Sequence, residues 1–397
     1  MTKLEQLINE LCPNGVEYTT VGECCNISAG GDVPKDRFSK EKTDFYSIPI
    51  ISNGIGENAL YGYTDSPKIT ENAVTVAARG TIGYAEYRDY PYYPIIRLLS
   101  LIPKNPEKLS AKFLFYSLQG REYPVPKSGI PQLTAPNIKK EVIPLPPLPV
   151  QSEIVRILDN FTELTAELTA ELTARQSQYE YYASNMFPSI KKSDVKWIEL
   201  GEVATVTKLA GFEFTKYVTY SDAGNIIALR GLNVKNGHLV LDDVKYIDNS
   251  NLEMLSRSKL RIGDMLFTYV GTVGQVALIQ ENDKYYLAPN VALVRITDER
   301  FLPEYMMYYF LTDKFEQEQI AKLLQASSMQ NIPMEKIRKF KLPLISIEEQ
   351  RKTIDILNRF DTLCNDISEG LPAEIEARQN QYEYYRDKLL TFKEKVN

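Results

Sequence analysis

The sequence has 397 residues, of which 44% are hydrophobic and 25% charged, a balance that is ordinary for a globular protein of two or three domains. Its net charge of −6 argues against nucleic-acid binding through bulk positive charge, and its single histidine, His238, excludes a histidine-based catalytic triad or metal cluster. The four cysteines show no CxxC or disulfide spacing, and no apolar run reaches the roughly 18 residues of a membrane helix, so we expect a cytoplasmic protein with no membrane partner.

The first part of the chain predicts a short helix followed by a domain of strands. Residues 1–15 have the polar, amphipathic pattern of a helix, and residues 16–148 alternate short apolar runs with turn residues such as Asn53-Gly54 and Arg79-Gly80. The apolar runs predict strands at residues 48–51, 73–77 and 95–102, a helix at residues 110–118 and an extended proline-bearing segment at residues 142–149.

A long helix is predicted next, over residues 149–194. Its apolar residues recur at three- and four-residue steps for about 35 residues, which at 1.5 Å per residue corresponds to a length of about 50 Å. The middle of this helix contains the tetrapeptide Glu-Leu-Thr-Ala three times in succession, from Glu163 to Ala174. We interpret this tract as a rigid rod, although a solvated low-complexity helix has the same composition.

The second half of the chain repeats the first. Residues 195–344 predict a domain with strands and a helix in the order of the first domain, at residues 226–229, 264–270, 291–296 and 303–311. Residues 345–397 predict a second long helix, in which Gly370 and Pro372 indicate a stop and restart. Two landmarks recur: Gly80-Thr81-Ile82-Gly83 as Gly271-Thr272-Val273-Gly274, and Ala174–Tyr182 as Ala377–Tyr385 with eight of nine residues identical.

We therefore expect an α/β (α+β) fold with an internal pseudo-two-fold repeat. Two similar domains with mixed twisted sheets would be separated by two long helices. Each helix has one apolar stripe, and two such stripes are most simply buried by packing the helices antiparallel as a coiled coil. Between the shared landmarks the two domains differ widely in sequence, so we expect the fold to repeat while the side chains on it differ.

Catalytic and cofactor motifs are missing from the sequence. Residues 54–59 (Gly-Ile-Gly-Glu-Asn-Ala) superficially match a dinucleotide fingerprint, but turn and strand residues follow them instead of a helix that could hold a pyrophosphate. The sequence has no P-loop and no Asn/Asp-Pro-Pro-aromatic motif of the kind that adenine methyltransferases use. We expect that this polypeptide catalyses no reaction and holds no cofactor or metal of its own.

Five motifs, each weak alone, occur together and in a fixed order. They are the opening at residues 4–18, the two Gly-Thr-Ile/Val-Gly loops, the Pro-Leu-Pro-Pro-Leu and Gln-Ser-Glu-Ile helix entry, the Glu-Leu-Thr-Ala tract and the Gln-Tyr-Glu-Tyr-Tyr helix end. In these motifs the chain resembles, over essentially its whole length, the specificity subunit of a type I restriction-modification system.

The resemblance implies a DNA-binding role in phage defence. In that family two target-recognition domains each read one half of a bipartite site on double-stranded DNA, while the helices space them and dock two methyltransferase subunits. Those partners would bind S-adenosylmethionine and methylate adenine at N6, and up to two restriction subunits would join through them. Because the domains differ between their landmarks, we expect an asymmetric site, and the tetrapeptide tract would set the spacing of its halves.

Base-reading residues are expected among polar side chains near turns. Arg and Lys recognise guanine and Asn and Gln recognise adenine in the major groove, with Ser, Thr and Tyr helping. The candidates are Lys35, Arg37, Ser52, Asn53, Arg79, Thr81 and Gln132 in the first domain, and Lys216, Arg230, Asn233, Tyr269, Thr272 and Asn331 in the second. Gln132 and Asn331 occupy equivalent places in the matched segments 128–132 and 327–331.

Two tyrosine-rich helix ends are the candidate partner-binding surfaces. They comprise Tyr179, Tyr181 and Tyr182 in the first long helix and Tyr382, Tyr384 and Tyr385 in the second. The tyrosines could simply complete the coiled-coil stripe, or they could form matched patches that each bind one methyltransferase subunit, since tyrosine is enriched at interfaces. Both interpretations hold if Tyr179 and Tyr182 face inward while Tyr181 faces outward.

The sequence leaves three alternative functions open. The same architecture could serve a system whose nuclease and methyltransferase share a polypeptide, which the neighbouring genes would reveal. A coiled-coil scaffold would neither bind duplex DNA nor co-purify with a methyltransferase. A self-sufficient enzyme would transfer a labelled methyl group to DNA by itself, but the single histidine and the missing cofactor motifs argue against it.

Overall fold

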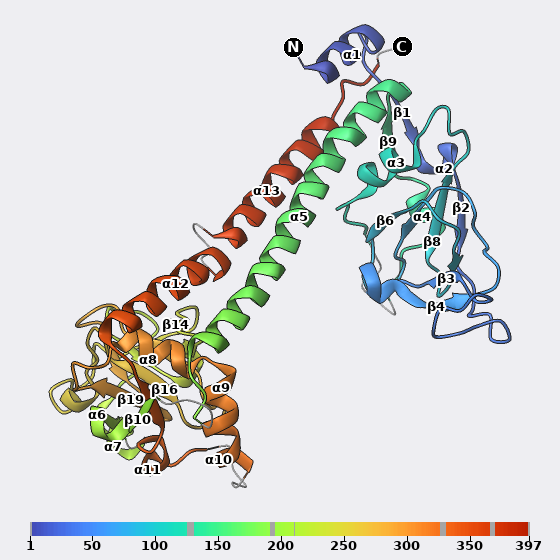
Figure 1. Ribbon diagram of the computed structural model, residues 1–397. Helices are drawn as coiled ribbons and strands as arrows, with labels where there is room; N and C mark the ends of the chain where they lie inside the picture. Colours follow the sequence, from blue (N-terminus) through green and yellow to red (C-terminus); the bar gives the residue numbers. More distant parts are fainter. Residues whose placement is uncertain are drawn as a thin grey trace. The chain divides into compact units, whose positions relative to one another are not determined.

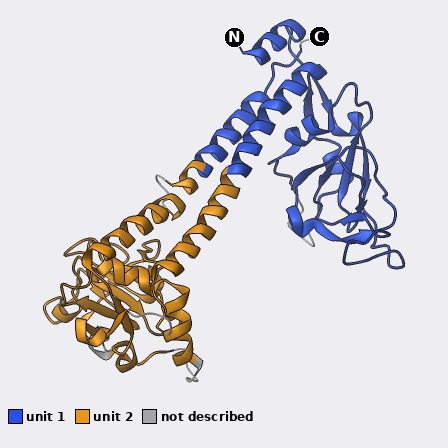
Figure 2. Ribbon diagram, in the orientation of Figure 1, with its two compact units in different colours: residues 1–167, 375–397 blue, residues 168–374 orange. Residues whose placement is uncertain are grey.

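Figure 1 shows the computed structural model, which describes residues 2–124, 131–190, 195–209, 211–325, 331–365 and 370–395. The chain forms two units, residues 1–167 with 375–397 and residues 168–374 (Figure 2). Each unit contains one α/β domain, which we call domain 1 (residues 16–148) and domain 2 (residues 195–344). The matched segments 128–132 and 327–331 lie largely outside the described residues, as do residues 366–369 of the predicted helix interruption.

Unit 1 is built mainly of short strands. In chain order it contains α1 (Lys3–Leu11), β1 (Glu17–Thr20), α2 (Val21–Cys24), β2 (Cys25–Ala29), β3 (Ile48–Ile51), η1 (Gly56–Ala59), β4 (Leu60–Thr64), β5 (Ala73–Val76), β6 (Ala85–Arg88), β7 (Tyr93–Pro94), β8 (Leu99–Pro103), α3 (Ala111–Leu118), α4 (Ala135–Ile138), β9 (Val142–Leu145), the first part of α5 (Leu148–Met186) and most of α13 (Leu371–Leu389).

Unit 2 repeats this order with a few additions. It contains the rest of α5, β10 (Lys196–Glu199), α6 (Leu200–Val203), β11 (Ala204–Lys208), α7 (Gly211–Tyr217), β12 (Ile227–Leu229), η2 (Gly231–Asn233), β13 (Val234–Lys235), β14 (His238–Leu239), β15 (Lys245–Tyr246), η3 (Ser256–Ser258), β16 (Met265–Thr268), β17 (Val276–Leu278), β18 (Tyr285–Leu287), β19 (Val291–Ile296), α8 (Pro303–Phe310), α9 (Asp313–Phe315), η4 (Glu316–Ile320), α10 (Ala321–Gln325), α11 (Met334–Ile337), β20 (Lys341–Leu344), α12 (Ile347–Asn365) and the start of α13.

Three sheets recur with the same topology in the two domains, and domain 2 adds the antiparallel pair β13-β14. Domain 1 has a four-stranded antiparallel sheet in the order β2-β8-β5-β6, and domain 2 has β11-β19-β16-β17. Each also has a mixed three-stranded sheet, β4-β3-β7 and β15-β12-β18, and an antiparallel pair that closes the domain, β1-β9 and β10-β20. The predicted mixed α/β fold with an internal repeat is therefore confirmed.

The apolar runs of the sequence form the cores of the two units. All four residues of β5 and of β16 are buried, because the central strands are covered on both faces. Helix α3 covers the sheet of domain 1 with Phe113 and Leu114, and α8 covers that of domain 2 with Tyr305 and Phe310. The described chain contains no helix that is both long and apolar enough to cross a membrane.

One predicted strand is wrong in its extent. Residues 95–102 read as a continuous apolar run, but β8 begins only at Leu99. Ile96 and Arg97 instead adopt left-handed conformations, with φ of 54° and 60°. This conformation is rare for residues other than glycine and is costly for a β-branched side chain, so tertiary contacts must impose it.

The long helices are paired in the same way within each unit. Helix α5 has 39 residues, and α13 begins at Leu371 with Pro372 in its first turn, as predicted. In unit 1 the Phe161 ring of α5 stacks on Tyr385 of α13, 5.5 Å between centroids. In unit 2 the Phe360 ring of α12 stacks on Tyr182 of α5 at 5.8 Å. Each domain therefore packs on the start of its own helix and on the end of the other repeat's helix.

A buried glutamine fixes each domain to the helix that follows it. The Gln151 amide accepts from Ser110 N (2.9 Å) and donates to the carbonyls of Lys108 and Pro146 (2.7 Å each). Gln350 repeats the arrangement in unit 2 with Leu302 N, Arg300 O and Ile345 O. Both glutamines are fully buried.

The substitution Gln151→Leu is expected to destabilise unit 1 by about 2–4 kcal/mol. The leucine leaves three backbone groups without their side-chain partner, of which Pro146 O is buried and the other two are part-buried. A buried unsatisfied group costs about 1–3 kcal/mol, and a part-buried one costs less. Urea unfolding would measure the loss. Gln176→Leu, at an exposed position of the same helix, is the matched control and should change stability little. Equal midpoints for Gln151→Leu and the native chain would contradict this role.

A carboxylate on α5 should make stability depend on pH. Arg156 and Lys3 hold the Glu153 pKa at about 2, against an ordinary value of 4.5, through contacts of 2.7 and 2.9 Å. Because the folded-state pKa is depressed, the stabilisation is complete above about pH 4.5 and is lost as the pH falls towards about 2. The difference in urea midpoint between native and Glu153→Gln chains should thus shrink between about pH 6 and about pH 3.5. A difference that stays constant over this range would refute the assignment.

Candidate nucleic-acid interface

Five of the seven candidate residues of domain 1 lie together at the ends of its strands. Ser52 and Asn53 follow β3, Arg79 and Thr81 lie in the turn between β5 and β6, and Gln132 approaches from the segment before α4. Asn53 Nδ2 donates to Ile96 O (2.6 Å), while Asn53 Oδ1 accepts from Ala78 N (2.7 Å). Thr81 Oγ1 donates to Asn53 O (2.6 Å), and Ser52 Oγ donates to Ala59 O (3.1 Å).

These bonds explain the strained backbone before β8. The side chain of Asn53 ties the β3 end to the left-handed Ile96 on one side and to the β5–β6 turn on the other. Three loops are thereby held in one arrangement. Strain of this kind concentrates at functional sites, where it is retained because it positions side chains.

Two arginines share the amide oxygen of Gln132. Arg79 donates to Gln132 Oε1 through Nε (3.2 Å) and Nη2 (3.0 Å), and Arg97 donates to the same oxygen through Nη1 (3.3 Å). We call Arg79, Gln132 and Arg97 the arginine cluster. Arg97 was missed from the sequence because it lies within an apolar run, although a charge interrupting that run was a sign that the run is not one buried strand.

The arginine cluster carries positive charge that domain 1 does not neutralise. Within the described ranges neither Arg79 nor Arg97 has a carboxylate at ion-pairing distance, whereas Arg37, Arg88 and Arg121 each have one. Two guanidinium groups that share one neutral acceptor repel each other. The cluster is therefore a prepared site for an electronegative ligand, such as a base edge or a phosphate.

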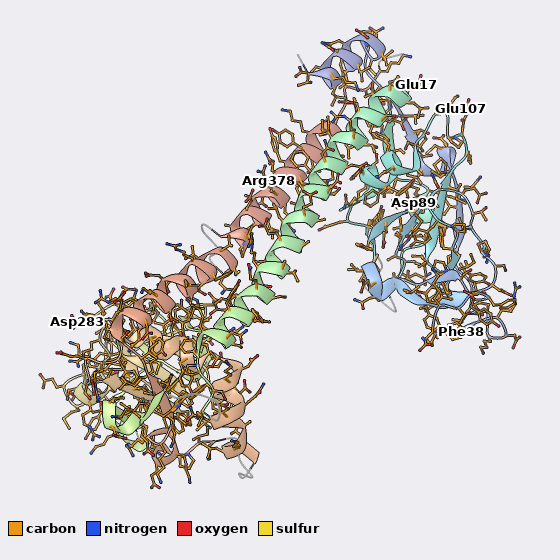
Figure 3. All side chains as sticks on the ribbon, viewed as in Figure 1. Glu17, Phe38, Asp89, Glu107, Asp283 and Arg378 are labelled. Atoms are coloured by element: carbon orange, nitrogen blue, oxygen red, sulfur yellow. The ribbon has the colours of Figure 1, made fainter. Side chains whose placement is uncertain are left out.

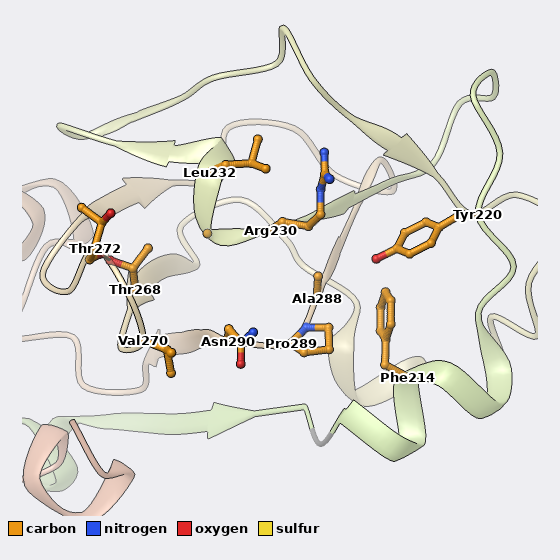
Figure 4. Close-up of a pocket in the computed structure, with 11 residues that line it drawn as sticks. Phe214, Tyr220, Arg230, Leu232, Thr268, Val270, Thr272, Ala288, Pro289 and Asn290 are labelled. Carbon is orange, nitrogen blue, oxygen red and sulfur yellow. Dashed lines mark hydrogen bonds between the residues drawn. The ribbon is translucent and has the colours of Figure 1, made fainter. Parts of the chain in front are cut away.

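Domain 2 has a pocket of about 550 Å³ at the corresponding place (Figure 4). The turn between β16 and β17 has left-handed glycines at the same two positions as the turn between β5 and β6: φ is 77° and 93° at Gly271 and Gly274, and 70° and 89° at Gly80 and Gly83. The pocket is lined by Phe214, Tyr220, Arg230, Gly231, Leu232, Thr268, Val270, Thr272, Ala288, Pro289 and Asn290.

Backbone hydrogen bonds fix which residues of the two domains correspond. Ile95 N donates to Ile51 O as Ala288 N donates to Leu229 O, and Leu133 N donates to Ala78 O as Ile332 N donates to Tyr269 O. Four pairs follow from this register: Ser52 with Arg230, Arg79 with Val270, Arg97 with Asn290, and Gln132 with Asn331. Asn290 also has a left-handed φ, 70°, like Arg97. The scaffold is thus conserved between the domains while its exposed side chains are exchanged.

Arg230 is the charged residue of the pocket. Its Nη2 donates to the carboxylate and the carbonyl of Asp243 (2.9 and 2.8 Å), while its Nε is buried without a partner in the described chain. Nearby Tyr220 and Leu232 are about half exposed, 47% and 52%. A ligand that offers both an acceptor and a flat or apolar surface would satisfy this lining.

Two further candidates of domain 2 are buried. Asn233 is completely enclosed: it accepts from Arg230 N and donates to Val240 O and Asp243 O, so its amide shapes the loop and has no hydrogen left for a ligand. Tyr269 is 9% exposed, burial raises its pKa, and Lys208 Nζ lies 5.7 Å from its ring centre.

The remaining DNA candidates lie apart from these two sites. Arg37 pairs with Asp65 at 2.7 Å and belongs, with the exposed Lys35, to the loop before β3. Phe38 of this loop, which Figure 3 labels, packs on Tyr61 with 5.5 Å between the ring centroids. Exposed Lys216 lies on α7 with its Nζ 5.2 Å from the Tyr217 ring centre. All three lie outside the arginine cluster and outside the lining of the domain 2 pocket.

The tyrosine patches contain inner and outer residues, but Tyr182, which was expected to face inward, stacks on Phe360 and is still 43% exposed. Tyr179 packs on Phe360 at 6.2 Å, and burial raises its pKa to about 12. Burial also raises the pKa of Tyr382 to about 12, and its hydroxyl donates to the Gln119 amide oxygen. Tyr181 and Tyr384 are 66% and 61% exposed. Each stands edge-on against the next tyrosine, Tyr182 or Tyr385, with an interplanar angle of 75° in both cases.

Similar proteins share this architecture. The chain is 28% identical to the Type I restriction enzyme EcoR124I/EcoR124II specificity subunit of Escherichia coli, over 99% of this chain and 97% of that one. It is 32% identical to a putative type I restriction enzyme specificity subunit of Haemophilus influenzae, over 72% and 73%. The crystal structure of the type I restriction-modification S subunit from M. genitalium superposes with a TM-score of 0.58 at 15% identity, covering 95% of this chain and 96% of that one.

The family model also follows the internal repeat. A model described as the type I restriction modification DNA specificity domain matches residues 13–175 and again residues 192–377. Each match begins near the start of a domain and extends into the long helices after it, ending within α5 and within α13. The chain therefore belongs to the family of type I restriction-modification specificity subunits, with two copies of the specificity domain.

Proposed function

We propose that domain 1 and domain 2 each bind one half of an asymmetric bipartite site on double-stranded DNA. The arginine cluster is the observation that carries this proposal, because it presents unneutralised, fixed donors at the strand ends of domain 1. The pocket of domain 2 occupies the matching place with different side chains. Equivalent backbone positions that carry different side chains in the two domains favour the recognition of two different half-sites.

The chain would act as the recognition subunit of a larger enzyme. Its repeated tyrosine patches support the binding of two methyltransferase subunits, one on each patch, because Tyr181 and Tyr384 are exposed in the same local geometry. Those partners would supply S-adenosylmethionine and N6-adenine methylation, and restriction subunits would join through them. The acidic composition fits a division in which the partners make much of the phosphate contact.

Adenine methylation mapped by single-molecule sequencing tests this function. The chain would be co-expressed with the methyltransferase subunit encoded beside it, and again without it, in a host that lacks adenine methylation. One bipartite, asymmetric methylated motif that depends on this chain is the expected result. The proposal would be overturned by scattered methylation from the co-purified complex, or by no methylation from a co-purified complex that binds S-adenosylmethionine. Methylation by this chain alone would also overturn it.

A further inference from the structure

We infer that the half-site bound by domain 1 contains guanine, read in the major groove by Arg79 and Arg97, and that domain 2 makes no guanine contact from the equivalent positions. This inference rests on the proposed DNA-binding function and adds the base class to it. It follows from the donors of the arginine cluster, from how they are held and from what replaces them in domain 2.

The free donors of the cluster suit guanine. Arg79 uses Nε and Nη2 on Gln132, and Arg97 uses only Nη1, which leaves Nη1 of Arg79 and the Nε–Nη2 edge of Arg97 without a partner in the described structure. Guanine presents two acceptors, N7 and O6, in the major groove, and a guanidinium fork contacts both at once. Adenine offers only one acceptor there, beside an amino donor that would face a cation.

The way in which the arginines are held favours base reading over phosphate binding. Arg79 is half-buried, its guanidinium is oriented by the Gln132 amide, and Asn53 fixes the backbone next to it through Ala78 N. Arg79 thus offers Nη1 from a fixed position, and Arg97, tethered to the same amide oxygen through Nη1, offers the Nε–Nη2 fork. Donors held in this way discriminate between acceptor patterns, whereas a phosphate contact needs only a nearby cation. No carboxylate competes for either arginine within the described ranges, so the donors are available to DNA.

The comparison of the two domains also favours base reading over phosphate binding. A phosphate contact carries no sequence information, so both domains would be expected to keep it. Instead Val270 and Asn290 replace Arg79 and Arg97 where the backbone hydrogen bonds of the two domains match, although Gly231 and Pro289 stand where domain 1 has Asn53 and Ile96. Val270 is 38% exposed, and an apolar side chain suits the thymine methyl group, while asparagine pairs with adenine. The two positions therefore fit guanine in domain 1 and an A·T pair in domain 2.

The decisive experiment exchanges these side chains within the complex. The variant Arg79→Val with Arg97→Asn places the domain 2 residues on domain 1, and asparagine tolerates the left-handed φ of residue 97. Lys140→Gln removes one positive charge from an exposed position of the same domain outside the cluster and is the control. Methylated motifs would be mapped for all three complexes, and binding would be measured to duplexes carrying 7-deazaguanine, which lacks the N7 acceptor.

The double variant should lose its preference for guanine at one or two positions of one half-site, by about 10- to 100-fold in relative affinity, and keep the other half-site. 7-Deazaguanine at those positions should weaken binding by the native complex but not by the double variant. An affected half-site without guanine, or an equal loss for every sequence, would overturn the inference while the bipartite motif of the native complex still upheld the proposed function. If the double variant fails to fold, the 7-deazaguanine measurement on the native complex and the single variant Arg97→Asn give the same decision.

Discussion

Replacing Tyr181 and Tyr384 together by alanine is expected to weaken the binding of both methyltransferase subunits by roughly 30-fold each, and either replacement alone is expected to weaken the binding of one subunit. Exposed tyrosines at the centre of an interface commonly contribute about 2 kcal/mol or more, which corresponds to a roughly 30-fold weaker Kd per site. The two residues share one local geometry, edge-on to a tyrosine that itself stacks on Phe360 or Phe161. Their effects on the two binding events should therefore be equal.

The measurement is the mass of the complex across a titration with the methyltransferase subunit, by native mass spectrometry or light scattering. Gln176→Ala with Gln379→Ala is the matched control, because these exposed residues occupy equivalent positions on the same two helices. The inner tyrosines are left intact, so the helix pairs of both units should melt as in the native chain. Two methyltransferase subunits bound to the double tyrosine variant as tightly as to the native chain would show that the patches serve only to complete the helix packing.

The fold could be predicted from the sequence because its signals are periodic and repeated. The strands at residues 48–51 and 291–296 and the helix after residue 302 follow from apolar runs bounded by turn residues. The duplicated helix ends indicate the internal repeat from the sequence alone. Such features depend on local pattern, which a single sequence contains.

The candidate site was only partly predictable, for a physical reason. Arg97 acquires its role from left-handed backbone at residues 96–97, where the Asn53 side chain bonds Ile96 O, and Asn290 has a left-handed φ in domain 2; no local pattern reports either. Asn233 and Asn53 look alike in the sequence, each in a polar turn. Yet the Asn233 amide is enclosed in domain 2, whereas Asn53 joins three loops beneath the arginine cluster.

Deleting residues 167–170, one Glu-Leu-Thr-Ala repeat of α5, is expected to shorten the spacer of the methylated motif by one or two base pairs and to leave both half-sites unchanged. Four helical residues correspond to about 6 Å of axial shift and about 40° of rotation, and base pairs rise about 3.4 Å each. The deletion lies at the boundary between units 1 and 2, and the nearest core residues on α5 are Leu158 and Tyr179, so both domains should fold.

The control for this deletion keeps the helix length. Glu167→Ala with Thr169→Ala changes two exposed residues of the same repeat and should leave the spacer as it is. A spacer that shortens with the deletion but not with the substitutions would show that the length of α5, not its chemistry, sets the distance between half-sites. An unchanged spacer in the deletion variant would mean that this distance is fixed elsewhere, for example by the methyltransferase subunits. Unchanged half-sites in both variants are expected because the arginine cluster and the domain 2 pocket are built from strand ends that the tract does not touch.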